Sequence, residues 1–309
     1  MADELIDGSD TGRGERAMAM AATVRDLVSV FKLRIGFAIT LSALGGLAVT
    51  EGALPDGTAI AALALAVFLA SASAGAFNQL VERDLDARMP RTRNRPFVAG
   101  RLRAGAGWLV TILALLAAAV LLAAGVANGW AALYVFLGAV TYGVVYTVWL
   151  KRRTWLNIVV GGLSGSFAVL AGAAAVDPAI GAAPLLLAIV LFLWTPPHFW
   201  SLSMALREDY AEAGVPMLPV VVGNRLCAKV VFAHTLALSI LALLPALAGM
   251  GRIYLFATLA GGIWFTLESW WLVMRPTRRQ AMRNFFASLG QLLLLLLGAI
   301  ADRWLSGTG

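Results

Sequence analysis

The sequence predicts an all-α protein that crosses a membrane many times. The chain has 309 residues, of which 60% are hydrophobic and 13% charged, whereas a soluble domain carries about 25% charged residues. The apolar residues form long uninterrupted runs, each near the ~20 residues that an α-helix needs to cross the hydrocarbon core of a bilayer. Apolar and polar residues do not alternate in these runs, so the strands of a membrane β-barrel are excluded.

Nine runs are long enough to be transmembrane helices. In chain order they are residues 28–50, 59–83, 104–126, 130–150, 156–176, 182–206, 227–249, 253–274 and 283–305. The segment before them, 1–26, is polar and of mixed charge and does not resemble a signal peptide. It is predicted to be a disordered cytoplasmic tail, and residues 27–309 are predicted to form a single nine-helix domain.

The basic residues predict how these helices are oriented. If the spans alternate from a cytoplasmic N-terminus, all but two of the 24 Lys and Arg residues fall in cytoplasmic segments, the exceptions being Arg252 and Arg303. This is the positive-inside pattern, and it predicts an N-in, C-out protein of the inner (cytoplasmic) membrane. The net charge of +7 therefore indicates topology and not nucleic-acid binding. Cys227 is the single cysteine, which excludes intramolecular disulfides.

The connections between spans differ on the two sides. The external ones, such as "EGALPDGT" and "VDPAIG", are short and carry little charge. Two cytoplasmic ones, which follow the second and sixth spans, are longer and begin with acidic residues. Long charged loops are usually functional. Their spacing, four helices apart, predicts two similar halves that face one cavity.

The first of these connections continues an acidic ladder from the end of the second span. Asn78, Glu82 and Asp86 are spaced i, i+4, i+8, so they share one face of a helix if the helix continues past the membrane edge. One amide and two carboxylates are hard oxygen ligands. They suit Mg²⁺, which takes one or two carboxylates together with waters and substrate phosphates.

The second connection carries another group of acids, and basic residues surround both. Glu208, Asp209 and Glu212 lie at the start of the segment 206–226. Two such clusters across one cavity are predicted to hold metal ions on a polyanion, whose remaining oxygens would be bound by basic side chains. These are Arg83, Arg88, Arg91, Arg93, Arg95, Lys151, Arg152 and Arg207. The alternative is a set of solvated ion pairs at the membrane edge.

These residues resemble a known family. "NQLVERDLD" followed by "RTRNRP" is similar to the first acidic motif of the UbiA-type intramembrane prenyltransferases. Four segments carry the resemblance, at 31–36 ("FKLRIG"), 78–96, 146–162 and 195–223. In the last, "PPHFW" followed by "DY" and "GVPMLP" is typical of one branch of the family, the protoheme IX farnesyltransferases (heme O synthases).

The resemblance implies a fold, a reaction and a set of site residues. The fold is nine helices around a central cavity open to the cytoplasmic side and to lipid. The reaction is Mg²⁺-dependent transfer of a farnesyl group from farnesyl diphosphate to a vinyl group of heme b, which gives heme O for terminal oxidase assembly and for a downstream heme-modifying enzyme. The residues implied are Asn78, Glu82 and Asp86 for the first metal–diphosphate motif, Asp209 with Glu208 and Glu212 for the second, and Tyr146 with Lys151 for a loop that contacts diphosphate. Glu82 stands where Asp is commoner in the family.

His198 is a candidate within the sixth span. Ionisable residues inside spans are functional candidates by default, so His198 is predicted to contact heme through its iron or a propionate, or to handle a proton. The alternative is a structural histidine beside Pro196 and Pro197, where freed backbone groups need partners.

Two rival functions stay open. One is prenyl transfer to another acceptor, such as a quinone-precursor ring, although the "PPHFW" segment argues against it. The other is a transporter with charged cytoplasmic gates, although transporter sites lie near the membrane midplane and these carboxylates lie at its edge.

Overall fold

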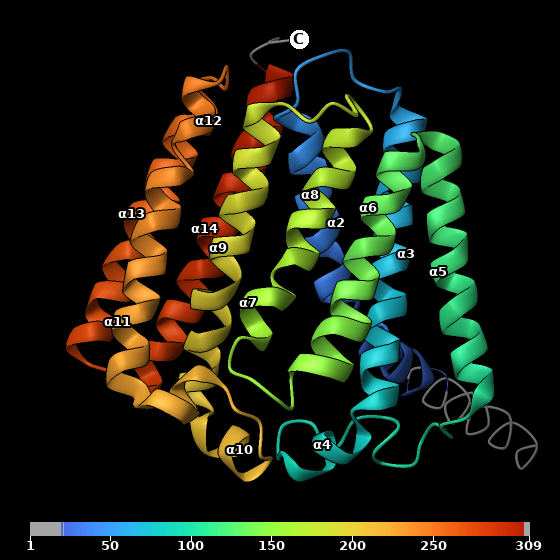
Figure 1. The fold of residues 1–309 in the computed structure, drawn as a ribbon, viewed down its shortest axis with the longest axis vertical. Helices are drawn as coiled ribbons and strands as arrows, with labels where there is room; N and C mark the ends of the chain where they lie inside the picture. The colour runs from blue at the N-terminus through green and yellow to red at the C-terminus, as the bar shows by residue number, and fades with distance from the viewer. Residues whose placement is uncertain (1–19, 21, 306–309) are drawn as a thin grey trace, which may run out of the picture.

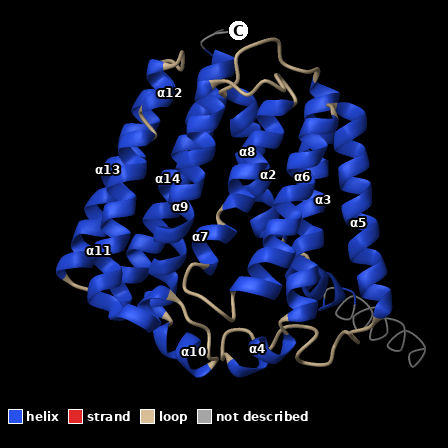
Figure 2. Cartoon of the chain, viewed as in Figure 1, coloured by secondary structure: helices blue, strands red, loops and turns tan. Residues whose placement is uncertain are grey.

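The computed structural model describes Met20 and residues 22–305, and every regular element in that part of the chain is a helix (Figure 2). Of the predicted disordered tail, residues 1–19 and 21 lie outside the described residues, whereas residues 22–26 lie in the helix Ala22–Val30. After a helix at Ala22–Val30, the elements are α2 (Leu33–Ala48), α3 (Gly57–Val81), α4 (Arg83–Arg88), α5 (Ala106–Val126), α6 (Gly129–Val140), the π-helix η1 (Thr141–Leu150), α7 (Asn157–Gly161), α8 (Leu163–Ala174), α9 (Ala182–Ala205), α10 (Arg207–Glu212), α11 (Leu218–Leu241), α12 (Leu244–Leu247), α13 (Arg252–Met274) and α14 (Arg278–Leu305).

The predicted all-helical membrane fold is confirmed, but fewer than nine of the described helices are both long and apolar enough to cross a membrane. Among the described helices, seven are long and apolar enough to cross a membrane, and the bent pair Ala22–Val30 and Leu33–Ala48, which meet at 46°, makes an eighth. The predicted span at 253–274 corresponds to α13. This helix has 23 residues but is less apolar than those seven helices, because it contains Glu268 and several polar or small residues.

The long helices run side by side along one axis (Figure 1). The short helices α4 and α10 lie at one end of the bundle, and α12 and the end of the described chain lie at the other. Asp302 of α14 belongs to that second end. Its buried carboxylate accepts hydrogen bonds from the backbone N–H groups of Gly251 (2.5 Å) and Ile253 (3.0 Å). It thereby caps the N-terminus of α13, whose first N–H groups have no partner within the helix.

Small residues allow α2 and α8 to pack closely. A Cβ added to Gly172 of α8 would overlap the carbonyl oxygen of Ala43, and one added to Gly46 of α2 would overlap that of Val169. Glycine at these two positions therefore permits backbone-to-backbone contact, as is common between membrane helices. The two helices also line the apolar cavity described below, so this contact fixes part of its wall.

Candidate active site

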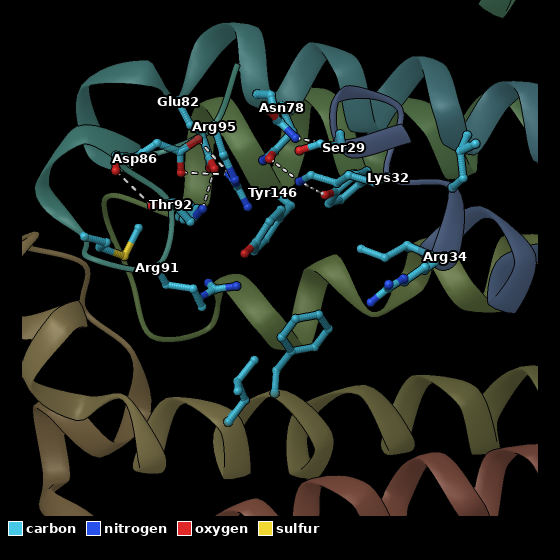
Figure 3. Close-up of a pocket in the computed structure, with 18 of the residues that line it drawn as sticks. Ser29, Lys32, Arg34, Asn78, Glu82, Asp86, Arg91, Thr92, Arg95 and Tyr146 are labelled. Atoms are coloured by element: carbon cyan, nitrogen blue, oxygen red, sulfur yellow. Dashed lines mark hydrogen bonds and ion pairs between the residues drawn. The ribbon is translucent and has the colours of Figure 1, made fainter. Parts of the chain in front are cut away.

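A polar cavity of about 470 Å³ lies where the helix Ala22–Val30 approaches the ends of α3, η1 and α4. Figure 3 shows its lining, with the acidic ladder and Arg95 on one side and Arg91 and Arg34 on the other. The side chains that line it include Lys32, Asn78, Glu82, Asp86, Arg91, Arg95, Tyr142, Tyr146, Lys151 and Tyr210. It therefore gathers residues from distant parts of the sequence at the α4 end of the bundle.

The predicted ladder faces this cavity. Asn78, Glu82 and Asp86 are 2%, 0% and 1% exposed, and all three line it. The backbone bends at Glu82 (φ −89°, ψ 16°), where α3 gives way to α4. Helical hydrogen bonding nevertheless continues through the bend, from Glu82 N to Asn78 O (2.9 Å) and from Asp86 N to Glu82 O (2.8 Å). The i, i+4, i+8 spacing therefore does place the three side chains on one face.

Each carboxylate of the ladder is paired with a cation. Glu82 Oε2 lies 2.5 Å from Lys151 Nζ, and Arg95 Nη1 donates to both carboxylate oxygens of Asp86 at 2.8 and 2.7 Å. Buried charges are stable only when they are paired and hydrogen-bonded. The pairs therefore hold two acids and two cations around the same small space.

Lys32 is a site residue that the sequence analysis missed. It adopts a left-handed backbone conformation (φ 49°) at the start of α2. Its ammonium donates to Asn78 Oδ1 and, at 2.9 Å, to the Tyr142 hydroxyl. Asn78 Nδ2 in turn donates to Thr147 Oγ1 (2.9 Å). A lysine inside the first predicted span, within the "FKLRIG" segment, was the available signal.

The π-helix η1 brings two tyrosines to the cavity. The backbone N–H of Lys151 bonds Tyr146 O, five residues earlier, at 2.9 Å. The rings of Tyr142 and Tyr146 stack with centroids 5.7 Å apart and planes 15° apart. π-Helical turns are rare and are frequently found at functional sites. Here the turn aligns both rings and leaves Lys151 directed at Glu82.

One buried oxygen of the ladder is not satisfied. Glu82 Oε1 has no hydrogen-bond partner, and an unpartnered buried acceptor is costly. A hard cation would satisfy it, and Asn78 and Asp86 supply further oxygens of the type that Mg²⁺ takes. Among the described residues, no three His, Cys, Asp or Glu side chains form a metal-binding cluster. The described side chains alone therefore do not enclose a metal ion, and the open oxygen of Glu82 fits a magnesium ion that takes most of its other ligands from water and substrate.

An apolar cavity of about 590 Å³ adjoins the polar one. It reaches along α2, α3, α6, α8, α9 and α14 and is lined mainly by apolar side chains. The residues that line both cavities are Arg34, Ile35, Arg91, Tyr142, Tyr146, Phe199 and Leu202. Both volumes are in the range of small-molecule sites. The pair is suited to a ligand with an anionic head and an apolar body.

His198 lies in the wall of the apolar cavity and is buried, with 7% of its surface exposed. Its ring stacks on Trp194 (centroids 4.3 Å apart) and on Phe285 (4.5 Å). Its Nδ1 lies 2.7 Å from Ser288 Oγ of α14. The structure thus places His198 at the apolar cavity and not at the polar one.

The predicted phosphate-binding arginines divide into two groups. Arg91 and Arg95 line the polar cavity, and Arg91 also lines the apolar one. The others do not line either cavity and are exposed: Arg83, Arg88, Arg93, Arg152 and Arg207. Only the first two are therefore placed to contact a ligand there.

Two of the exposed arginines have other partners. Arg152 forms a bidentate pair with Asp84 at 2.6 and 2.7 Å, and this hydrogen bonding lowers the pKa of the Asp84 carboxyl below its usual range. Arg207 Nε donates to Pro219 O at 2.9 Å. The exposed ion pair of Arg152 adds little stability, so both contacts chiefly occupy the guanidinium groups.

The second acidic group lies close to the first, but its carboxylates do not line the cavity. Leu85 and Met89 of the α4 region pack against Tyr210 and Ala213 of the α10 region, so the two predicted loops do meet. On α10, however, Tyr210 takes the inward position and lines the polar cavity. Glu208 and Glu212 are exposed and Asp209 is half-buried, and none of the three lines either cavity.

The family of the chain follows from comparison with known proteins. A family model described as the UbiA prenyltransferase family matches residues 39–292, which is most of the chain. The chain belongs to the UbiA prenyltransferase family. The resemblance seen in the four segments is confirmed, and this UbiA protein is an enzyme, a prenyltransferase.

Curated relatives cover nearly the whole UbiA protein described here. Protoheme IX farnesyltransferase 2 of Paramagnetospirillum magneticum is 57% identical over 288 residues, which cover 93% of this chain and 100% of the relative. Protoheme IX farnesyltransferase 1 of the same organism is 43% identical, covering 91% and 99%. Among solved structures, a UbiA homolog from Archaeoglobus fulgidus bound to DMAPP and Mg²⁺ gives a TM-score of 0.68 at 16% identity, over 87% of this chain and 99% of that one. This last likeness shows a shared UbiA fold.

Proposed function

We propose that this prenyltransferase transfers the farnesyl group of farnesyl diphosphate to a vinyl group of heme b, with Mg²⁺, to give heme O. The observation that carries the proposal is the pair of adjoining cavities, one polar and cationic and one apolar. The names of the relatives at 57% and 43% identity support the choice of substrates. Farnesyl diphosphate and heme both combine anionic groups with a large apolar body.

The polar cavity would bind the diphosphate. Lys32, Lys151 and Arg95 now contact oxygens of the ladder, and Arg91 faces them across the cavity (Figure 3). Their N–H groups can turn to phosphate oxygens, which guanidinium groups bind well. Asn78, Glu82 and Asp86 would hold the magnesium ion. When bound, that ion supplies positive charge to the departing diphosphate.

Bond cleavage and bond formation would take place where the two cavities meet. The allylic C–O bond breaks, and its electron pair leaves with the diphosphate, whose charge the fixed cations stabilise. The heme vinyl electrons then form the new C–C bond to farnesyl C1. Water adds to the cation left on the heme side and releases one proton, which gives a hydroxyethylfarnesyl group. Tyr146 lies at this junction, and the apolar lining keeps other water away from the allylic cation.

His198 is proposed to contact heme in the apolar cavity, which its ring lines. Arg83, Arg88, Arg93, Arg152 and Arg207 keep only a supporting role in the proposal, as positive charge near the cavity mouth. Glu208, Asp209 and Glu212 are proposed to complete a second metal site once substrate is bound, through a movement of α10 that turns the half-buried Asp209 inward.

The membrane arrangement is part of the proposal. We infer that residues 27–309 form one domain of nine spans, N-in and C-out in the inner membrane, with the polar cavity open to the cytoplasm. α13 supports this count because it runs beside α14 between the two ends of the bundle (Figure 1). The described chain also begins near the α4 end and finishes at the opposite end. A downstream heme-modifying enzyme would consume the product.

Mass analysis of the product tests the proposal. The purified protein in lipid nanodiscs receives farnesyl diphosphate, heme b and Mg²⁺, and we expect a heme heavier by one farnesyl group and one hydroxyl group, with release of one diphosphate per product. Chelation of Mg²⁺ should stop the reaction, and added Mg²⁺ should restore it. Prenylation of 4-hydroxybenzoate without any heme product would assign another acceptor. Binding of farnesyl diphosphate without diphosphate release would favour a transporter.

A further inference from the structure

Ser288 of α14 holds two aromatic residues of α9. It is fully buried. Its carbonyl oxygen accepts a hydrogen bond from Trp194 Nε1 (2.9 Å), and its hydroxyl lies 2.7 Å from His198 Nδ1. Trp194 and His198 are one helical turn apart on α9, and their rings stack. A single residue of the neighbouring helix therefore fixes both rings in the wall of the apolar cavity.

The Ser288 hydroxyl donates its proton to a backbone oxygen and not to His198. Ser288 Oγ lies 2.6 Å from the backbone oxygen of Phe285, one turn earlier on α14. Two oxygens at that separation share a hydrogen, and a carbonyl has none to give. A serine hydroxyl has one proton, so it is donated to Phe285 O. The hydroxyl must then accept from the histidine, and His198 carries its proton on Nδ1.

The other ring nitrogen, Nε2, is consequently unprotonated and carries a free lone pair. A neutral imidazole with Nδ1–H has no proton on Nε2. No described residue hydrogen-bonds His198 Nε2, while Trp194 and Phe285 stack on the two faces of the ring with interplanar angles of 17° and 25°. The ring cannot tilt easily, and it lines the apolar cavity. Phe199 packs edge-on against the ring (centroids 5.1 Å apart, planes 83° apart) and lines the same cavity, so the unprotonated edge is the part left to a ligand that enters beside Phe199.

We propose that Ser288 is a positioning residue that keeps His198 in the Nδ1–H form, so that Nε2 is an axial ligand for the iron of a porphyrin bound in the apolar cavity. The proposal rests on the proposed function and narrows it. A lone pair repels a propionate carboxylate but binds a metal. Metal-ligating histidines characteristically donate their other ring N–H to an oxygen that fixes the tautomer.

A second buried contact holds the two helices in register near this histidine. Asn284 Nδ2 of α14 donates to Ser201 Oγ (2.8 Å), and Ser201 Oγ donates to Pro197 O (2.6 Å). Asn284 and Ser201 are both fully buried. α14 is thereby tied to α9 directly at the double proline, so Ser288 keeps its place opposite His198.

The test is a spectroscopic titration that separates iron from the porphyrin ring. Ferric heme and metal-free protoporphyrin IX are each titrated into wild type, Ser288→Ala, Ser288→Thr and Ser203→Ala in nanodiscs. Ser203 is the matched control, since it is also fully buried and its hydroxyl also bonds a backbone oxygen three residues earlier, that of Trp200 (3.1 Å), away from the histidine. We expect Ser288→Ala to bind heme about 10-fold more weakly, with a shifted Soret band, and to bind metal-free porphyrin normally. Ser288→Thr and Ser203→Ala should match wild type.

His198→Ala gives the direct comparison. It should lose the nitrogen-ligated heme spectrum, keep its affinity for metal-free porphyrin, and regain the spectrum when imidazole is added. If wild type and His198→Ala have the same heme spectrum and affinity, the inference is overturned. It is also overturned if Ser288→Ala loses heme and metal-free porphyrin equally, because the residue would then only shape the cavity. Formation of farnesylated heme by wild type would show that the proposed function stands even in these two cases.

Discussion

At the scale of single residues, the acids of the ladder are buried in ion pairs and are not solvated at a cavity mouth. Asp86 is 1% exposed and accepts two hydrogen bonds from Arg95. Removing one partner of a buried pair leaves the other without compensation and is strongly destabilising. Truncation of Asp86 to alanine would therefore mix a loss of chemistry with a loss of fold.

Asp86→Asn is the cleaner change, because it keeps the shape and an accepting oxygen but removes the negative charge. We expect product formation to fall by ~10²-fold or more, since a charge that helps the diphosphate to leave is lost. The measurement is heme O formation per minute, with thermal melting followed in detergent. Asp84→Asn, two residues away and exposed, is the control and should keep wild-type turnover. Equal turnover in the two variants would remove Asp86 from the site.

The residue scale also shows what spacing can and cannot predict. Asn78, Glu82, Asp86, Tyr146 and Lys151 were identified from sequence, and the structure places all five in one cavity lining. Local spacing works there because one helix face presents the first three. The charge of Lys32 inside a predicted span was a signal of function, but its partners lie 46 and 110 residues away, and no local pattern predicts such contacts.

The acids of α10 illustrate the opposite difficulty. Their type and spacing resemble a second metal motif, but a helix of six residues presents only a narrow face to the cavity. Tyr210 and Ala213, which are buried against Leu85 and Met89, decide which face that is. Packing against apolar residues of the neighbouring loop sets the orientation of α10. The charge pattern alone does not predict that orientation.

At the scale of elements, the contact between α2 and α8 is the tightest constraint on the apolar cavity. Gly172→Ala should destabilise the protein by about 1–3 kcal/mol, because the new methyl group must displace the backbone of α2 at Ala43. Thermal melting in detergent measures the effect. Gly165→Ala in the same helix is the control, since a Cβ there meets no atom within 4 Å. Equal melting of the two variants would contradict the close approach.

Element boundaries were predicted better than element geometry. The predicted second span, 59–83, corresponds to α3 at Gly57–Val81, and the predicted continuation of that helix is present beyond the bend at Glu82. The π-helical hydrogen bonding of η1 was not predicted, because it has no signature in apolar periodicity. Glu268, a charged residue within α13, accepts hydrogen bonds from Arg283 (2.8 Å) and Gln280 (2.6 Å) of α14. Its role is therefore to hold these two helices together.

At the scale of the whole molecule, the orientation in the membrane is the main prediction. Reporters fused after Arg93 and after Ala211 should read cytoplasmic, and reporters fused after Asp56 or at the C-terminus should read external. The physical reason is the distribution of Lys and Arg, which leaves only Arg252 and Arg303 outside. Enzymatic activity of paired cytoplasmic and external reporters measures it. A cytoplasmic C-terminus would refute the nine-span arrangement and would make α13 a helix that does not cross.

Because of the π-helical turn of η1, the geometry of the site depends on the number of residues in this segment. Each i→i+5 bond encloses one more residue than an α-helical bond, so the turn accommodates one extra residue without turning the side chains that follow. If the same number of residues formed α-helical bonds, those side chains would rotate by about 100°, and Lys151 would leave Glu82. Val144 and Val148, which are 49% and 45% exposed, should by contrast accept other apolar residues. In related sequences the outward-facing residues of this stretch should therefore vary freely, whereas the number of residues in it should stay constant.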